Sequence, residues 1–171
     1  MHPEPTPASE LVEQLDPEGR VVGVVTRAEM RRRNLPHRAV YVLVIDEAGR
    51  LLVHQRADWK DVWPSRWDVA FGGVAGVGEA PVENARRELA EEAGIQAPLQ
   101  RLGHGSYEDG EVRVRGDVYL VRHEGPFTFP DGEVVATDWV PAARIPRWLE
   151  GRPVCPDSVA IALPLLPERT S

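Results

Sequence analysis

The chain has 171 residues, 42% of them hydrophobic, and a formal net charge of −7. This length and composition fit one globular domain with a real core, and no apolar run approaches the roughly 18 residues of a membrane helix. The acidic balance argues against broad nucleic-acid binding. The single cysteine, Cys155, excludes an internal disulfide, and no signal peptide is visible, so we expect a cytoplasmic protein.

The first part of the chain combines a proline- and glutamate-rich stretch with a short strand and helix. Residues 1–18 predict a mobile N-terminal tail, with at most one turn near Ser9–Leu15. Residues 20–26 are typical of a short strand. Thr26 and Glu29 form a capping-box signature for a helix over Thr26–Asn34. Its arginine run is typical of a solvated face, and contact with a substrate phosphate or RNA is the alternative. The run comprises Arg27, Arg31, Arg32 and Arg33.

The next segment predicts strands on either side of a polar loop. Residues 37–46 are β-branched and apolar, which indicates a buried strand. After a Glu-Ala-Gly turn, residues 50–56 are expected to pair back as a hairpin. Residues 57–66 form a polar loop with two tryptophans, and residues 67–71 predict a strand that leads into a glycine-rich loop.

The stretch from Gly73 to Ile95 predicts a loop, a helix of about three turns and a glycine stop. Pro81 suits the first helical position. The spacing of Glu88, Glu91 and Glu92 places three carboxylates on one face, where they repel one another. Two of them occupy the last turn, which favours cations instead. A solvated acidic face is one interpretation; a hard divalent cation such as Mg²⁺ or Mn²⁺ among the carboxylates is the other.

The last third predicts more strands and two C-terminal helices. Residues 102–108 and 112–122 indicate two longer strands joined at Asp109–Gly110, and residues 133–140 indicate another. Helices are expected to begin within 141–149 and 157–163. Strands of mixed connection with helices on both faces predict an α/β fold, an α/β/α sandwich with a mixed sheet.

The glycine loop and helix carry the complete pattern G-x5-E-x7-R-E-U-x-E-E-x-G-U, in which U is apolar. The fixed places are Gly73, Glu79, Arg87, Glu88, Leu89, Glu91, Glu92, Gly94 and Ile95. This pattern resembles the box of the Nudix hydrolase family. The resemblance implies the Nudix fold, one domain over residues 19–171 with its core at about 36–142, and cleavage of a phosphoanhydride bond.

The resemblance also implies roles for individual residues. The glutamates of the box (Glu88, Glu91 and Glu92), with the carbonyl of Gly72, would hold one to three Mg²⁺ ions, with Mn²⁺ as the alternative, and a metal-activated water would attack the substrate. Either Glu88 or Glu91 would accept the proton. An ion pair between Arg87 and Glu79 would pin the loop to the helix. Gly73 and Arg56 would face the substrate, although a surface salt bridge is an alternative for Arg56. A fourth carboxylate is expected among Glu111, Asp117, Glu133 and Asp138.

Two other functions remain as alternatives. Part of the chain looks like the branch that includes isopentenyl-diphosphate isomerase, but Gly72 and Val74 stand where that enzyme has its Cys and His. His37 matches one metal histidine of the isomerase, and Met30 stands in place of the second. A Nudix-fold binding module without turnover is the other alternative, although such modules usually lose box glutamates.

The substrate class follows only by elimination. The sequence lacks the family markers for NADH, coenzyme A, ADP-ribose and dinucleoside polyphosphates. Simple nucleoside di- or triphosphates are therefore the first candidate substrate class, and nucleotide sugars are the second. One of the tryptophans could stack on a base. We expect a small-molecule nucleotide substrate, no nucleic-acid or membrane partner, and a monomer.

Overall fold

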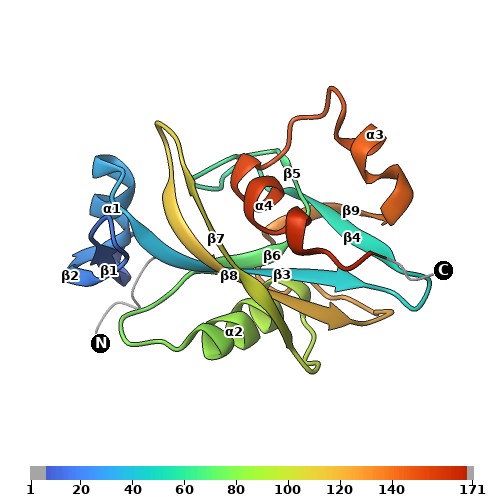
Figure 1. Cartoon of the computed structure of the whole chain (residues 1–171), viewed down its shortest axis with the longest axis horizontal. Coiled ribbons are helices and arrows are strands. Elements are labelled where there is room, and N and C mark those ends of the chain that lie inside the picture. The colour runs from blue at the N-terminus through green and yellow to red at the C-terminus, as the bar shows by residue number, and fades with distance from the viewer. Residues whose placement is uncertain (1–6, 169–171) are drawn as a thin grey trace.

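A computed structural model describes residues 7–168 and builds them around one mixed sheet (Figure 1). The sheet has the strand order β5-β4-β3-β8-β7, with β6 paired to β3 and β9 paired to β4. Its strands are β3 (His37–Ile45), β4 (Arg50–Arg56), β5 (Trp67–Asp68), β6 (Phe71–Val74), β7 (Gln100–Glu108), β8 (Arg113–Arg122) and β9 (Val134–Pro141). Strand β3 pairs parallel with β8, and the other pairings are antiparallel.

Strand β3 is the centre of the core because both of its faces are buried. Side chains alternate across a strand, so Val40, Val42 and Val44 belong to the apolar cluster on one face of the sheet. Tyr41 and Leu43 belong to the cluster on the opposite face. A strand buried on both sides has a nearly continuous apolar sequence, which is why residues 37–46 gave the clearest strand prediction.

Helices cover both faces of the sheet, which confirms the predicted α/β/α sandwich. Helix α2 (Pro81–Ala93) packs on β3 and β6, whereas α4 (Pro156–Ile161) packs on β7 and β8 from the other side (Figure 1). Helix α3 (Ile145–Leu149) lies next to β9. Single 3₁₀ turns occur at Pro7–Ser9, Ala142–Arg144 and Leu163–Leu165. None of the helices in residues 7–168 is long and apolar enough to cross a membrane.

The N-terminal segment is ordered from residue 7, so the prediction of a mobile tail over residues 1–18 is wrong for residues 7–18; residues 1–6 lie outside the described part. Strand β1 (Leu11–Leu15) pairs with β2 (Val21–Thr26) as an antiparallel ribbon. Val12 and Leu15 are buried. The prediction relied on the high glutamate and proline content and overlooked these two apolar side chains, which the ribbon buries.

Helix α1 (Arg27–Arg33) follows the ribbon and begins as predicted. The Thr26 hydroxyl accepts a hydrogen bond from the Glu29 N–H at 3.1 Å, which satisfies one of the free donors of the first turn. Met30 of α1, Val12 of β1 and Leu35 pack against Val74 of β6. The whole segment therefore rests on the strand that leads into the glycine loop.

Two predicted elements differ from the structure in a way that shapes the site. The turn after β3 forms, but Ile45 and Leu51 are the only residues that pair between β3 and β4. Strand β4 instead pairs with β9 along its whole length, from Arg50 to Arg56, and with β5 at His54 and Gln55. The single strand predicted for residues 67–71 is two strands, because β5 pairs with β4 and β6 pairs with β3.

Replacing Gly94 tests the glycine stop of α2. Gly94 has φ +67°, and an added Cβ would lie 1.9 Å from the Thr128 Oγ1. We expect Gly94→Ala to lower the free energy of unfolding by about 2–4 kcal/mol, from left-handed strain plus overpacking. Gly78→Ala is the matched control, since Gly78 has φ +69° and open space around it. Urea unfolding followed by circular dichroism measures both; equal losses would contradict the predicted overpacking.

Candidate active site

The glycine loop is tied to α2 by one bidentate ion pair. The Arg87 Nε and Nη2 donate to the Glu79 carboxylate at 2.8 and 2.9 Å, and the same carboxylate accepts the Gly76 N–H at 3.1 Å. The hydrogen bonds from Arg87 lower the pKa of Glu79. The predicted ion pair between Arg87 and Glu79 is therefore present. It fixes a helix start at which Ala80 offers no side-chain cap.

Glycine at positions 72 and 73 lets two chain segments approach closely. An added Cβ on Gly73 would lie 2.5 Å from the Glu88 Oε1. At Gly72 it would lie 1.9 Å from the Val40 carbonyl oxygen of β3. These glycines therefore bring the strand backbone against the Glu88 carboxylate and against the central strand, where larger residues would collide.

Two of the three box glutamates are buried. Glu88 is 8% exposed and Glu92 is 4% exposed. Burial raises the pKa of Glu88 to about 7, with the guanidinium of Arg87 acting in the opposite direction. Burial, followed by the negative charges of Glu88 and Glu133, also raises the pKa of Glu92. In the described part of the chain Glu92 has no hydrogen bond or ion pair, and the positive charges of Lys60 and Arg56 offset only part of the effect of burial on its pKa.

Glu91 differs from its two neighbours because its side chain is 51% exposed. The Arg87 Nη1 lies 3.0 Å from Glu88 and 3.3 Å from Glu91, between the two carboxylates. In the described part of the chain, no three acidic, histidine or cysteine side chains converge closely enough to hold a metal ion as they stand. Arg87 occupies the space between two of the predicted ligands, so Glu91 would have to rotate away from it.

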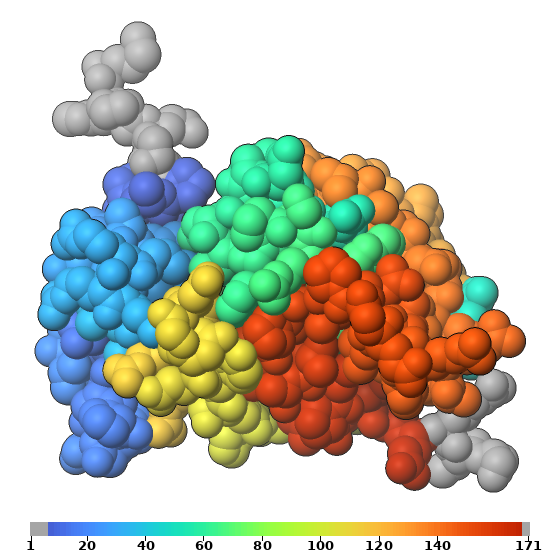
Figure 2. Space-filling view, turned by 90° about the horizontal axis from the view of Figure 1, so that it is seen from above, coloured from blue at the N-terminus to red at the C-terminus, as the bar shows by residue number. Residues whose placement is uncertain are grey.

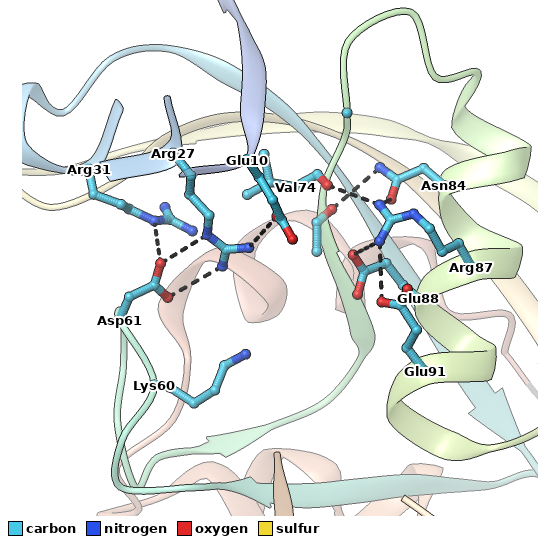
Figure 3. A network of polar contacts seen from close by, with 12 residues as sticks. Glu10, Arg27, Arg31, Lys60, Asp61, Val74, Asn84, Arg87, Glu88 and Glu91 are labelled. Carbon is cyan, nitrogen blue, oxygen red and sulfur yellow. Dashed lines mark hydrogen bonds and ion pairs between the residues drawn. The ribbon is translucent and has the colours of Figure 1, made fainter. Parts of the chain in front are cut away.

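The box glutamates line a cleft of about 610 Å³. One wall carries Glu88, Glu91 and Glu92 of α2, and Figure 3 shows the first two beside Arg87. The opposite wall carries Arg27 and Arg31, which Asp61 bridges, while Lys60 points into the space between the walls (Figure 3). Sequence reasoning gave no role to Lys60 or Asp61, because nothing in the polar loop over residues 57–66 distinguishes them from solvated charges.

The structure brings one of the four candidate carboxylates to the cleft. Glu133 lines it and forms an ion pair with the Lys60 Nζ at 2.6 Å. Asp117 instead pairs with Arg101 at 2.9 Å. Asp138 and Glu111 do not line the cleft. Asp131 does line it and was missed, although a turn acid two residues before Glu133 was a signal that could have found it.

Arg56 does not line the cleft, and the salt bridge that it forms is internal and not on the surface: its Nη1 lies 3.7 Å from the Asp68 Oδ2. Its side chain is 13% exposed, and its Nη2 donates to the Val62 carbonyl at 3.1 Å. Its Nε is buried and has no hydrogen-bond partner among residues 7–168. It lines an inner chamber of about 70 Å³, which shares Gly72 and Gly73 with the cleft.

The residues considered for an isomerase, Cys155, His37 and Met30, do not line the cleft. Cys155 is buried in the core on the other face of the sheet, and burial raises the pKa of its thiol. His37 is buried too, with its Nδ1 3.0 Å from the Leu35 carbonyl oxygen. Burial lowers the pKa of His37 to about 4, so the imidazole is neutral at pH 7. Met30 is packed in the N-terminal cluster.

Comparison with protein families places this geometry in a known class. A family model described as the NUDIX domain matches residues 35–157. YfcD of Escherichia coli K12, an uncharacterized Nudix hydrolase, is 35% identical over 139 residues, which cover 81% of this chain and 77% of that protein. The Nudix hydrolase SCO1686 of Streptomyces coelicolor is 38% identical over 149 residues, covering 85% and 80%. The chain belongs to the Nudix family, and the prediction of a Nudix hydrolase is confirmed.

Solved structures agree with the fold. DR0079 of Deinococcus radiodurans superposes with a TM-score of 0.75 at 22% identity, covering 88% of this chain and 95% of that one. The NUDIX domain of NrtR from Shewanella oneidensis, solved in complex with ADP-ribose, has a TM-score of 0.57 at 16% identity, with 77% and 90% covered. At sequence identities of 22% and 16%, these similarities show a shared fold and nothing about the substrate.

The buried charge of Glu88 predicts a pH-dependent cost in stability. Its pKa is about 7 when folded and 4.5 in the reference state, so the folded protein binds more protons between these values and loses stability as pH rises through them. A shift of this size corresponds to about 3 kcal/mol. In EDTA, the free energy of unfolding of Glu88→Gln relative to that of wild type should rise by about this amount between pH 4.5 and pH 8. A difference that does not change with pH would contradict this.

Proposed function

We propose that this chain is a metal-dependent Nudix hydrolase that cleaves the phosphoanhydride bond of nucleoside di- or triphosphates. The observation that carries the proposal is that Glu88 and Glu92, two acidic side chains, are buried together on the wall of an open cleft. Like charges buried together are costly, and a bound cation removes that cost. A solvated acidic face would leave both carboxylates in water.

The donor set fits a hard divalent cation. Members of the family generally use a divalent metal ion, and every candidate ligand here is an oxygen, the donor that Mg²⁺ and Mn²⁺ prefer. Glu88 and Glu92 would hold the ion, together with Glu91 and the carbonyl of Gly72. When bound, the ion would offset charge on the diphosphate oxygens and lower the pKa of water.

The residues around the carboxylates suggest separate tasks. Glu91 is the group that would accept the proton of the attacking water, since it is the exposed member of the three. Arg87 and Glu79 hold the glycine loop in place. Lys60 points into the cleft (Figure 3) and would bind a phosphate oxygen once it is released from Glu133.

Trp59 supports a nucleoside as the non-phosphate part of the substrate. It lines the same cleft and is 61% exposed, an unusual position for a large apolar ring. A flat aromatic face beside a phosphate site suits a nucleobase, which can stack on it. The cleft thus offers both a stacking surface and a diphosphate site.

Replacing Trp59 tests the nucleoside assignment. Base stacking on an aromatic ring is worth about 1–3 kcal/mol, so Trp59→Ala should raise KM for nucleoside diphosphates roughly tenfold and leave KM for inorganic tripolyphosphate unchanged. Trp59→Phe keeps a ring and should lose much less. Steady-state phosphate release measures all three proteins. Equal losses on both substrates would assign Trp59 to the fold of the loop.

Glu92→Gln tests the hydrolase itself. The amide cannot supply a charged metal ligand, so we expect turnover to fall by several orders of magnitude, while the loss of a buried charge leaves the fold intact. Glu83→Gln is the matched control, because Glu83 is an exposed residue of the same helix that pairs with Arg86. The assay is a Mg²⁺-dependent panel of nucleoside di- and triphosphates, nucleotide sugars, ADP-ribose and isopentenyl diphosphate.

The same panel decides between the proposal and its rivals. Near-full activity of Glu92→Gln would overturn the metal assignment. Conversion of isopentenyl diphosphate without phosphate release would favour an isomerase. Tight nucleotide binding by wild type without any product would favour a binding module.

A further inference from the structure

Helix α1 divides its arginines between two environments. Arg32 and Arg33 are exposed, and Arg33 forms an ion pair with Glu29 one turn earlier at 3.0 Å. Arg27 and Arg31, four residues apart and so on one face, have side chains that are only 18% and 17% exposed. These two line the cleft. The interpretation of the whole run as a solvated face is therefore right for one side of the helix and wrong for the other.

A single aspartate holds both cleft-facing arginines. The Asp61 Oδ2 lies 3.0 Å from the Arg27 Nε and 3.2 Å from the Arg31 Nε. Burial raises the pKa of Asp61, but the two guanidinium groups outweigh it, so the pKa lies below its usual range. The exposed Glu10 lies farther away, 3.7 Å from Arg27. Two nearly buried positive charges thus share one close negative charge.

Arg27 and Arg31 lie outside the family domain, and contacts between their helix and that domain fix their position. The family model begins at residue 35, and α1 ends at Arg33. Met30 anchors the helix on Val74 of β6, and the Asn34 side chain donates to the Asp109 carbonyl at 2.9 Å. Figure 2 shows the N-terminal segment in blue beside the turquoise residues of the 57–66 loop. The N-terminal segment therefore forms one wall of the cleft.

We propose that Arg27 and Arg31 form a binding site for the terminal phosphate of the substrate, and that Asp61 fills this site in the free protein until that phosphate displaces it. The inference rests on the proposed function and names the substrate more closely. Guanidinium groups bind phosphate through paired hydrogen bonds. A phosphate dianion brings two charges to a site where Asp61 brings one, so the exchange improves the charge balance.

A phosphate site formed by Arg27 and Arg31 would select substrates whose terminal phosphate carries no further group. A diphosphate substituted at both ends has one charge on each phosphate and a bulky group beyond it. Arg27 and Arg31 also line the inner chamber, which measures about 70 Å³; this is room for a few water molecules or one phosphate group and too little for a sugar. Nucleoside di- and triphosphates fit this site; nucleotide sugars and ADP-ribose do not.

Binding of inorganic pyrophosphate to the full chain in EDTA at pH 8, measured by calorimetry, tests the site without metal or turnover. We expect Arg27→Gln and Arg31→Gln each to bind at least tenfold more weakly than wild type. Asp61→Asn, which removes the internal counter-ion, should bind at least threefold more tightly. Arg33→Gln is the matched control on the exposed side of α1 and should stay within twofold of wild type.

Several results would overturn the inference. These are no pyrophosphate binding by wild type at millimolar concentration, equal binding by Arg31→Gln and Arg33→Gln, or weaker binding by Asp61→Asn with an unchanged circular dichroism spectrum. Arg31→Lys keeps the charge without the paired donors and should fall between wild type and Arg31→Gln. This comparison remains decisive if the Asp61 variant fails to fold.

Kinetics separate this inference from the proposed function. With Mg²⁺, Arg31→Gln should raise KM for a nucleoside diphosphate at least tenfold and change kcat less than threefold, because a guanidinium that binds the terminal phosphate equally in the ground state and the transition state affects KM alone. Arginine-dependent pyrophosphate binding without any hydrolysis would refute the proposed function alone. Hydrolysis with the same KM in wild type and Arg31→Gln would refute the phosphate site alone.

Discussion

The arrangement of the cleft depends on one constraint: like-charged carboxylates are held close together in a partly closed space. Glu88 and Glu92 are buried on one side of α2, and the charge of Glu133 comes close enough to raise the pKa of both. Arg87 and Lys60 offset part of this charge. A helix selected for stability alone would not concentrate acid at its C-terminal end. Stability is given up at this place, as is usual at functional sites.

The cleft exists because the strands around β3 diverge. Strand β6 pairs with one half of β3, whereas β4 touches β3 only at its far end and pairs with β9 along its whole length. The glycine loop follows β6, whereas the loop that carries Lys60 and Asp61 connects β4 to β5. The two loops therefore leave the sheet at separated points, and the space between them becomes the cleft.

Most of the fold and one wall of the site could be predicted from the sequence. The box, the strand from His37 and the stop at Gly94 could be predicted because each depends on local spacing and backbone chemistry. The pairing of β4 with β9 could not be predicted, since it joins residues about 80 to 90 positions apart. The roles of Lys60 and Asp61 were equally hidden, because loop charges acquire a role only when tertiary structure places them across from the box. The tail prediction failed since composition outweighed two buried side chains.

The two walls of the cleft come from parts of the chain under different constraints. The acidic wall lies within residues 35–157 and follows the family pattern. The basic wall lies in α1, which is joined to the domain through the apolar contact between Met30 and Val74 and through the hydrogen bond from Asn34 at its C-terminal end to Asp109. Changes in α1 can therefore alter which phosphates the cleft accepts without disturbing the carboxylates. Within one fold, bond cleavage and the choice of phosphate would then depend on different segments, and a likeness between family domains alone would not carry substrate preference from one member to another.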